Sequence, residues 1–182
     1  MKNTYQIDAA HSNVQFSVRH LMVSNVRGTF SGLTGTVSYD PDKPAEATID
    51  AVVDINTVNT NDEKRDGHLK SADFFDVAQY PVMTFKSKRV ESAGAGEYKV
   101  TGDLTVHGVT KEVSLSVEDV SGEVKDPWGN TKIGATVKGK LKRSDFGLSW
   151  NAPLETGGVL VGDDVKIEFD LQFLKATQGA TA

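Results

Sequence analysis

The sequence predicts an all-β fold, an eight-stranded antiparallel β-barrel with a short helical insert. Three observations lead to this prediction. Apolar and polar residues alternate with a period of two in segment after segment, as in strands with one dry face and one wet face. Most connections between these segments are short and rich in turn-forming residues. One polar segment near residue 60 breaks the alternation and has the pattern of a helix start.

The N-terminal half contains three alternating segments, at residues 14–18, 33–39 and 49–55. In each, apolar side chains occupy every second position, as Ile49 and Val53 do in the third. These three segments are therefore predicted to be strands.

The chain after the insert continues the pattern with a predicted hairpin. Its first strand contains Met83 and Phe85, and glycines interrupt the turn at residues 93–96. Further strands are predicted at residues 98–106, 113–117, 133–141 and 165–173. The last of these has the most regular alternation in the chain.

The segment that breaks the alternation begins with Thr60–Glu63, which has the pattern of a capping box. It predicts a short polar helix that runs to Lys70. Few apolar residues accompany it, among them Leu69, Phe74 and Phe75. We therefore expect the insert to lie against the sheet as a lid or a plug.

The chain of 182 residues is predicted to form one domain over residues 1–175, because no composition shift or proline-rich linker divides it. Residues 176–182 carry no packing signal, so we expect a disordered tail. Closing the sheet into a barrel removes exposed strand edges. A β-sandwich has the same number of strands, but its long crossings fit these short connections less well.

Charge and composition exclude several classes of partner. A net charge of −5, without a run of basic residues, argues against nucleic acid and against an anionic membrane surface. No apolar run is long enough to span a bilayer, so stable membrane insertion is not expected. The chain starts without the apolar region of a signal peptide and as written is predicted to be cytoplasmic. A processed periplasmic protein with a new start methionine would look the same.

An eight-stranded barrel is either filled by side chains or wide enough for one small ligand. Small residues occur at mid-strand on the predicted inward faces, namely Ala51, Gly102, Ala135 and Gly139. They are consistent with a cavity, and equally with the taper of a packed barrel. The strand at residues 165–173 would provide about 30 Å of apolar wall, which suits an elongated ligand.

The residues predicted to line such a ligand site are apolar and face inward on the predicted strands. They are Phe16, Val18, Phe30, Ile49, Val53, Ile55, Phe85, Val100, Leu104, Leu115, Val137, Leu141, Ile167, Phe169 and Leu171.

Several ordered segments carry a resemblance to a known family and together span nearly the whole chain. They are DAAHSNVQFSVRH at 8–20, SNVRGTF at 24–30, HLKSADFFDV at 68–77, YPVMTF at 80–85, GDLTVHGVTK at 102–111 and RSDFG at 143–147. In these segments the sequence resembles the YceI-like family of lipocalin-like, polyisoprenoid-binding proteins. The resemblance implies a lipocalin-like barrel that holds a polyisoprenoid or an isoprenoid quinone, and often a homodimer. Many relatives are exported.

Polar residues that could meet a ligand head group are few. His20 continues the inward alternation of Phe16 and Val18, and Arg27 follows after a turn, so both are predicted at one barrel rim. There they would bind the polar end of a lipid; alternatively, His20 bonds the turn backbone and Arg27 points to solvent. The four histidines lack the spacing of a metal motif, so no metal or other cofactor is expected.

The sequence therefore predicts non-catalytic binding, carriage or sequestration of a long apolar lipid. A barrel enzyme acting on an apolar isoprenoid-type substrate is the alternative, but no nucleophile motif or pair of inward proton-transfer groups supports it. A third reading is an interaction module with a solid core. Bound lipid extractable by organic solvent would separate the carrier from the module.

Overall fold

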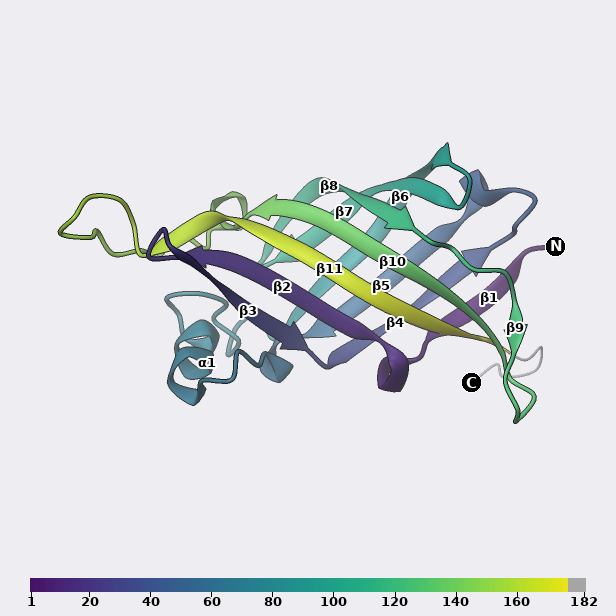
Figure 1. Cartoon of the computed structure of the whole chain (residues 1–182), viewed down its shortest axis with the longest axis horizontal. Helices are drawn as coiled ribbons and strands as arrows, with labels where there is room; N and C mark the ends of the chain where they lie inside the picture. Colours follow the sequence, from purple (N-terminus) through teal and green to yellow (C-terminus); the bar gives the residue numbers. More distant parts are fainter. Residues whose placement is uncertain (177–182) are drawn as a thin grey trace.

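A computed structural model describes residues 1–176 as one long antiparallel β-barrel (Figure 1). The strands are β1 (Asn3–Ile7), β2 (Asn13–His20), β3 (Ser24–Phe30), β4 (Gly32–Tyr39), β5 (Thr48–Asp54), β6 (Val82–Gly94), β7 (Glu97–Val106), β8 (Val109–Glu118), β9 (Val124–Lys125), β10 (Thr131–Lys142) and β11 (Val161–Lys175). The helices are the α-helix α1 (Glu63–Lys70) and the short 3-10 helices η1 (Ala9–His11), η2 (Pro44–Glu46), η3 (Ile55–Thr57) and η4 (Arg143–Phe146). None of the helices in residues 1–176 is long and apolar enough to cross a membrane.

Eight strands close the barrel, which confirms the predicted fold class and excludes the sandwich. Hydrogen-bonded neighbours follow the order β11-β1-β4-β5-β6-β7-β8-β10, and β10 pairs back onto β11. This closing ladder is long, from Lys132 opposite Leu174 to Lys142 opposite Asp164. Closure leaves no free edge along these strands, which is how an all-β chain avoids edge-to-edge aggregation.

At two places around the barrel, two consecutive short strands follow one another where a single long strand would otherwise run: β1 with β2, and β3 with β4. β11 pairs with β1 near its C-terminus, where Phe173 faces Ile7, and with β2 further back, where Phe169 faces Val14. Between them η1 breaks the ladder. In the same way β3 pairs with β2 while β4 pairs with β1. The edge of β3 away from β2 is bridged only at Thr29, opposite Asn59, within the described residues.

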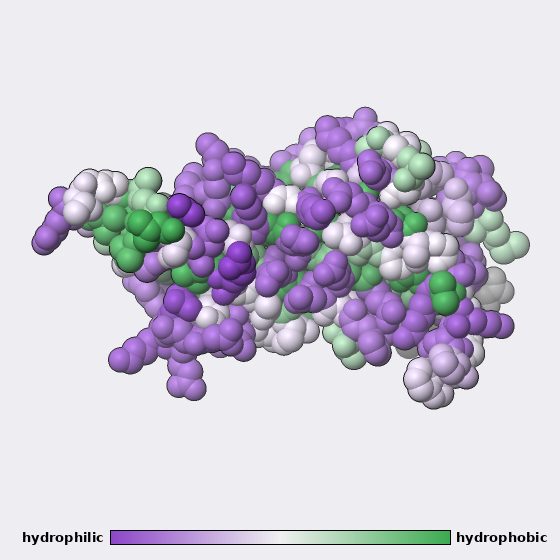
Figure 2. Space-filling view, in the orientation of Figure 1, coloured by the Kyte–Doolittle hydropathy of each residue, from purple (hydrophilic) through white to green (hydrophobic). Residues whose placement is uncertain are grey.

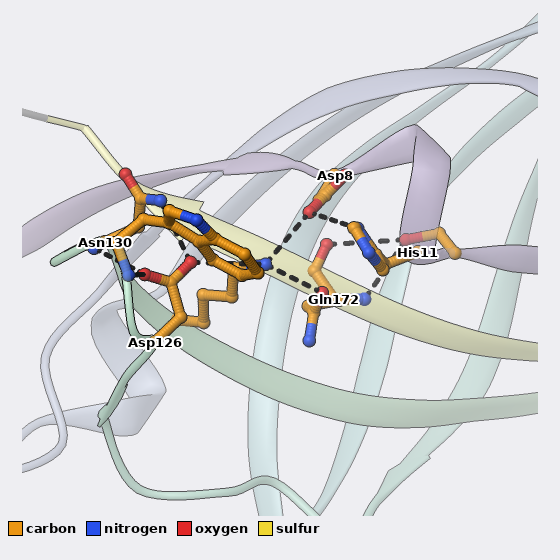
Figure 3. A network of polar contacts seen from close by, with 8 residues as sticks. Asp8, His11, Asp126, Asn130 and Gln172 are labelled. Carbon is orange, nitrogen blue, oxygen red and sulfur yellow. Dashed lines mark hydrogen bonds and ion pairs between the residues drawn. The ribbon is translucent and has the colours of Figure 1, made fainter.

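A polar network joins the break at η1 to β10 and β11 (Figure 3). The Asp8 carboxylate lies 2.8 Å from Nδ1 of His11 and 3.5 Å from Nζ of Lys132. Lys132 also donates to the side-chain oxygen of Gln172 at 3.3 Å and lies 3.7 Å from Asp126. Burial of Asp8 by itself raises its pKa, but the contacts with His11 and Lys132 outweigh burial and hold this pKa below its usual value.

The end of the barrel that carries the N-terminus and the end of β11 is filled by a core cluster of Tyr5, Ile133 and Phe173. The Tyr5 side chain is fully buried, and its hydroxyl donates to Glu123 at 2.6 Å. Burial and this neighbouring carboxylate raise the pKa of Tyr5 to about 12. Beyond β11, the Ala176 amide donates to the Thr4 carbonyl, while the rest of the predicted tail, residues 177–182, lies outside the described residues.

The insert covers the opposite end of the barrel (Figure 1). Its helix begins at Glu63 with Asp62 as N-cap, because the Asp62 carboxylate accepts the amide of Arg65 at 3.0 Å. The predicted capping box therefore starts two residues too early. Thr60 instead bonds the Asp66 carboxylate and accepts from Nε of Arg65 at 2.8 Å. We call residues 60–77 the lid.

Candidate functional site

The barrel encloses an apolar cavity of about 600 Å³, within the range typical of small-molecule sites. Side chains from almost every strand line it, and nearly all of them are apolar. The lid contributes Leu69, Phe74 and Phe75 to the wall. At the lid end the wall also includes Arg19, Asp62 and Lys64, which are exposed to solvent, so the cavity reaches the surface there. We call this opening the mouth.

The structure places every residue of the predicted apolar lining on the cavity wall except Ile55. Their contact with a ligand stays a prediction. Sequence reasoning missed further wall residues in the strands, in the lid and in the loop before β11, where Leu148 and Trp150 line the cavity. Val113, Val117 and Val165 share the alternation of their strands, so the same signal could have found them. Phe74 and Phe75 lie in the lid, where no period distinguishes an inward side chain from an outward one.

Ile55 is a correction to the predicted lining. It lies just beyond β5, at the start of η3, and its side chain is fully buried against Val58 and the core around Phe30. The strand ends because the Asp54 carboxylate accepts the Asn56 amide at 2.9 Å and starts a turn. The alternation of β5 therefore cannot be extended to Ile55.

The mid-strand glycines make room for neighbouring side chains rather than for an empty space. A Cβ on Gly102 would lie 2.7 Å from the Phe85 ring, and one on Gly139 would lie 2.7 Å from a methyl group of Leu115. Neither contact is sterically possible. Phe85 and Leu115 thus occupy the space above these glycines and form part of the cavity wall.

Polar wall residues are concentrated at the mouth. Apart from Thr84 and Trp150, they are Arg19, His20, Thr60, Asp62, Lys64, Arg65, His68 and Arg143. Six of these eight residues carry a basic side chain, while Asp62 alone is acidic. An elongated ligand in this cavity would therefore meet hydrocarbon along the barrel and basic side chains at one end.

His20 lies on the cavity wall as predicted, but Arg27 does not, so the predicted pairing of the two is wrong. Directly opposed residues of an antiparallel pair share a face of the sheet. Arg27 is opposite Ser17, whereas the inward residue Val18 is opposite Val26. The Arg27 side chain is consequently exposed on the outer face.

Arg143 organises the loop at the mouth. Its guanidinium is buried and donates to the carbonyls of Leu148 at 2.6 Å, Gly162 at 2.8 Å and Trp150 at 2.9 Å. Burial lowers the pKa of Arg143, and the negative charge of Asp163 offsets this lowering only in part. Its bonds fasten residues 147–161 across the end of β11. The RSDFG segment at residues 143–147 thus has a structural role here.

The lid is attached to this loop by an aromatic cluster. The His68 ring lies 4.7 Å from the Trp150 ring and 5.1 Å from the Phe74 ring, both edge-on. Nε2 of His68 also contacts the Asp73 carboxylate at 2.8 Å. His68 therefore positions aromatic side chains over the mouth. Within residues 1–176, no three His, Asp or Glu side chains come together in a way that could hold a metal ion; freedom from metal stays a prediction.

Fold and cavity together define the chain as a closed antiparallel β-barrel with an internal apolar site that opens at one end. The sequence profile of the YceI-like domain matches residues 5–173, and the chain belongs to the YceI-like family. The UPF0312 protein SA2479 of Staphylococcus aureus (strain N315) is 38% identical over 170 residues, which cover 93% of this chain and 96% of that protein.

Solved structures share the fold over nearly the whole chain. BcnA of Burkholderia cenocepacia superposes with a TM-score of 0.80 at 27% identity, covering 94% of this chain and 99% of BcnA. The YCEI protein of Campylobacter jejuni gives 0.73 at 34% identity, covering 93% and 96%. A polyisoprenoid binding domain from Saccharophagus degradans, implicated in plant cell wall breakdown, gives 0.68 at 22% identity, covering 94% and 98%.

Proposed function

We propose that this protein binds one polyisoprenoid or isoprenoid-quinone molecule inside the barrel and carries or sequesters it without catalysis. The observation that carries the proposal is the cavity, which apart from Thr84 is apolar along the barrel and is polar at the mouth. An isoprenoid lipid has the same division into a long hydrocarbon chain and one polar end. The polyisoprenoid binding domain of similar fold agrees with this choice of ligand.

The physical basis of binding is removal of hydrocarbon from water, at about 25 cal/mol per Å² of apolar surface. Phe16, Phe85, Ile167 and Phe169 are among the side chains that would contact the chain. Catalysis is not expected, because several of the polar mouth residues are already engaged in contacts within the lid. Arg65 donates to Thr60, and His68 contacts Asp73.

A matched pair of variants on β5 tests the proposal. Ala51 lies on the cavity wall, and its neighbour Val52 points outward with 39% of its surface exposed. Native mass spectrometry of protein purified from its own host, before and after solvent extraction, should detect an isoprenoid lipid. Ala51→Phe should greatly reduce its occupancy, while Val52→Phe should not. Protein that carries no extractable lipid, or equal occupancy in both variants, would refute the proposal.

The head group is proposed to lie beside His20 at the mouth. A polar group left unpaired in an apolar cavity costs several kcal/mol, so it must reach water or a donor. His20→Phe should weaken a prenyl phosphate or quinone about tenfold, roughly 1.4 kcal/mol, and leave a hydrocarbon of similar length unaffected. Arg27→Met, on the outer face, is the control. Equal weakening of both ligands by His20→Phe would assign this residue to the fold.

The homodimer implied by the family resemblance stays a prediction. Light scattering on the purified protein measures the molar mass and tests it directly.

A further inference from the structure

An exposed apolar tip stands beside the mouth. It comprises Leu21, Met22 and Val23 in the β2–β3 turn and Val159 in the loop before β11, with 41%, 57%, 73% and 41% of their surfaces exposed. The two segments are joined, because the Leu21 amide donates to the Leu160 carbonyl at 2.9 Å. Figure 2 shows a hydrophobic patch at this end of the molecule, where Figure 1 places the β2–β3 turn and the loop before β11. We call these four residues the apolar tip.

The turn holds large apolar residues in a backbone conformation that does not suit them. Leu21 and Met22 have φ angles of 52° and 63°, and the turn closes through the Val23 amide and the His20 carbonyl at 3.1 Å. Leu21, Met22 and Val23 connect the paired residues His20 and Ser24, and a β-turn with positive φ at both central positions is best formed by Asn-Gly. Strained positions of this kind cluster at functional sites. Met22 packs against Gly158, but 57% of its surface and 73% of that of Val23 stay exposed, so the packing gained in return for the strain is partial.

The apolar tip is continuous with the cavity wall. Arg19 and His20 precede it on β2, and Leu160 and Val161 follow it on the loop and β11; all four line the cavity. A hydrocarbon chain that leaves the mouth therefore meets the apolar tip next. The tip lies where an insoluble ligand must enter and leave.

We propose that the apolar tip makes reversible contact with the surface of an uncharged bilayer, so that the isoprenoid passes between bilayer and cavity without crossing water. The ligand in this proposal rests on the proposed function. A second copy of the chain fits the tip less well, because four partly exposed side chains cannot bury the roughly 800 Å² per partner of a stable interface. The tip offers only hydrocarbon contacts, so docking requires no lipid charge and an uncharged bilayer is sufficient.

Replacing the turn separates this role from folding. The double variant Leu21→Asn with Met22→Gly relieves the strain and removes two of the four exposed apolar side chains of the tip. We expect a melting temperature equal to or above that of the wild type, together with at least a tenfold loss of partitioning onto ligand-free phosphatidylcholine vesicles in a flotation assay. Wild type that does not float with the vesicles, or a double variant that floats equally well, would overturn the proposal.

Trp128 supplies a stringent control at the other end of the barrel. It follows β9, and with 83% of its surface exposed it is more exposed than any residue of the apolar tip. If vesicle binding were a general effect of exposed apolar side chains, Trp128→Ser would reduce it most. We expect Trp128→Ser to leave partitioning unchanged. A loss equal to that of the turn variant would overturn the assignment to the apolar tip.

Transfer kinetics distinguish this proposal from the proposed function. The rate of geranylgeraniol transfer from donor vesicles to wild-type protein should rise in proportion to vesicle concentration. For the turn variant, this rate should reach a plateau that is set by desorption of the alcohol from the vesicle into water. Native mass spectrometry tests cavity binding separately, without vesicles. A turn variant that binds the alcohol but keeps collision-dependent transfer refutes docking and leaves the cavity function standing. Concentration-dependent dimerisation lost in the turn variant would assign the tip to a second copy instead.

Discussion

The size of the cavity predicts how affinity depends on the length of an isoprenoid ligand. At roughly 30 Å³ per non-hydrogen atom, the volume of a water molecule in the liquid, a cavity of about 600 Å³ holds about 20 carbon atoms, or about four isoprene units. In a series of prenyl alcohols, affinity should rise with each unit up to about this length. Longer chains would extend out of the mouth into water, so their affinity should increase little further.

The slope of this series follows from hydrocarbon burial. One isoprene unit has five carbon atoms and gains about 4 kcal/mol at roughly 0.8 kcal/mol for each buried carbon. Ordering the unit costs about 1 kcal/mol. The remainder exceeds 1.4 kcal/mol, so each unit should lower Kd at least tenfold until the cavity is full.

Fluorescence of Trp150 at the mouth provides the assay, with Trp128→Phe removing the exposed background. Ala51→Phe adds a phenyl ring, about the size of one isoprene unit, and should move the break in the series from about four units to about three. Val52→Phe on the outer face should leave the break in place. A series without a break, or an equal shift in both variants, would refute the reasoning from cavity volume.

Three further predictions concern the fold. Leu171→Arg puts an unpaired charge on the cavity wall and should cost several kcal/mol in urea unfolding, whereas Glu168→Arg on the exposed face should cost less than about 0.5 kcal/mol; equal costs would contradict the assigned faces. Arg143→Met removes the donors that hold residues 147–161, so stability should fall by at least about 2 kcal/mol and amide exchange in this loop should accelerate; slow exchange would show that the loop is held otherwise. Because the pKa of folded Asp8 is lowered, its contribution to stability is complete above the unfolded pKa of about 3.9 and is lost as pH falls through the folded pKa. Asp8→Asn should therefore lower the urea concentration at the unfolding midpoint at pH 7, and this midpoint should fall less between pH 5 and pH 2 than it does in the wild type. A midpoint that falls as steeply as in the wild type would exclude Asp8 as the source of the acid dependence.

Strand faces could be predicted from the sequence because a period of two is a local property. A residue in the middle of β11, such as Phe169, faces the cavity whichever strands flank it. The prediction failed where the strand ends, at Ile55, because the turn is set by a hydrogen bond from Asn56 to Asp54 rather than by hydropathy. Similarly, the offset across the β2–β3 turn could not be obtained from one strand alone, so Arg27 was placed on the wrong face.

The lid shows a second limit of local patterns. Leu69, Phe74 and Phe75 have no regular spacing, and their position on the cavity wall depends on how the lid folds back over the barrel. The contact between His68 and Trp150 joins residues far apart in the chain. No sequence period could have indicated it.

By itself, the sequence determined the all-β class, the inward faces of the long strands and the shortage of inward polar groups, because these depend only on alternation and composition. Tertiary structure decided whether the barrel interior was filled. Gly102 and Gly139 were compatible with either outcome, and the structure shows that Phe85 and Leu115 occupy the space above them. The cavity exists because eight strands close at a diameter that these side chains do not fill, and a diameter is a property of the whole sheet rather than of any one strand.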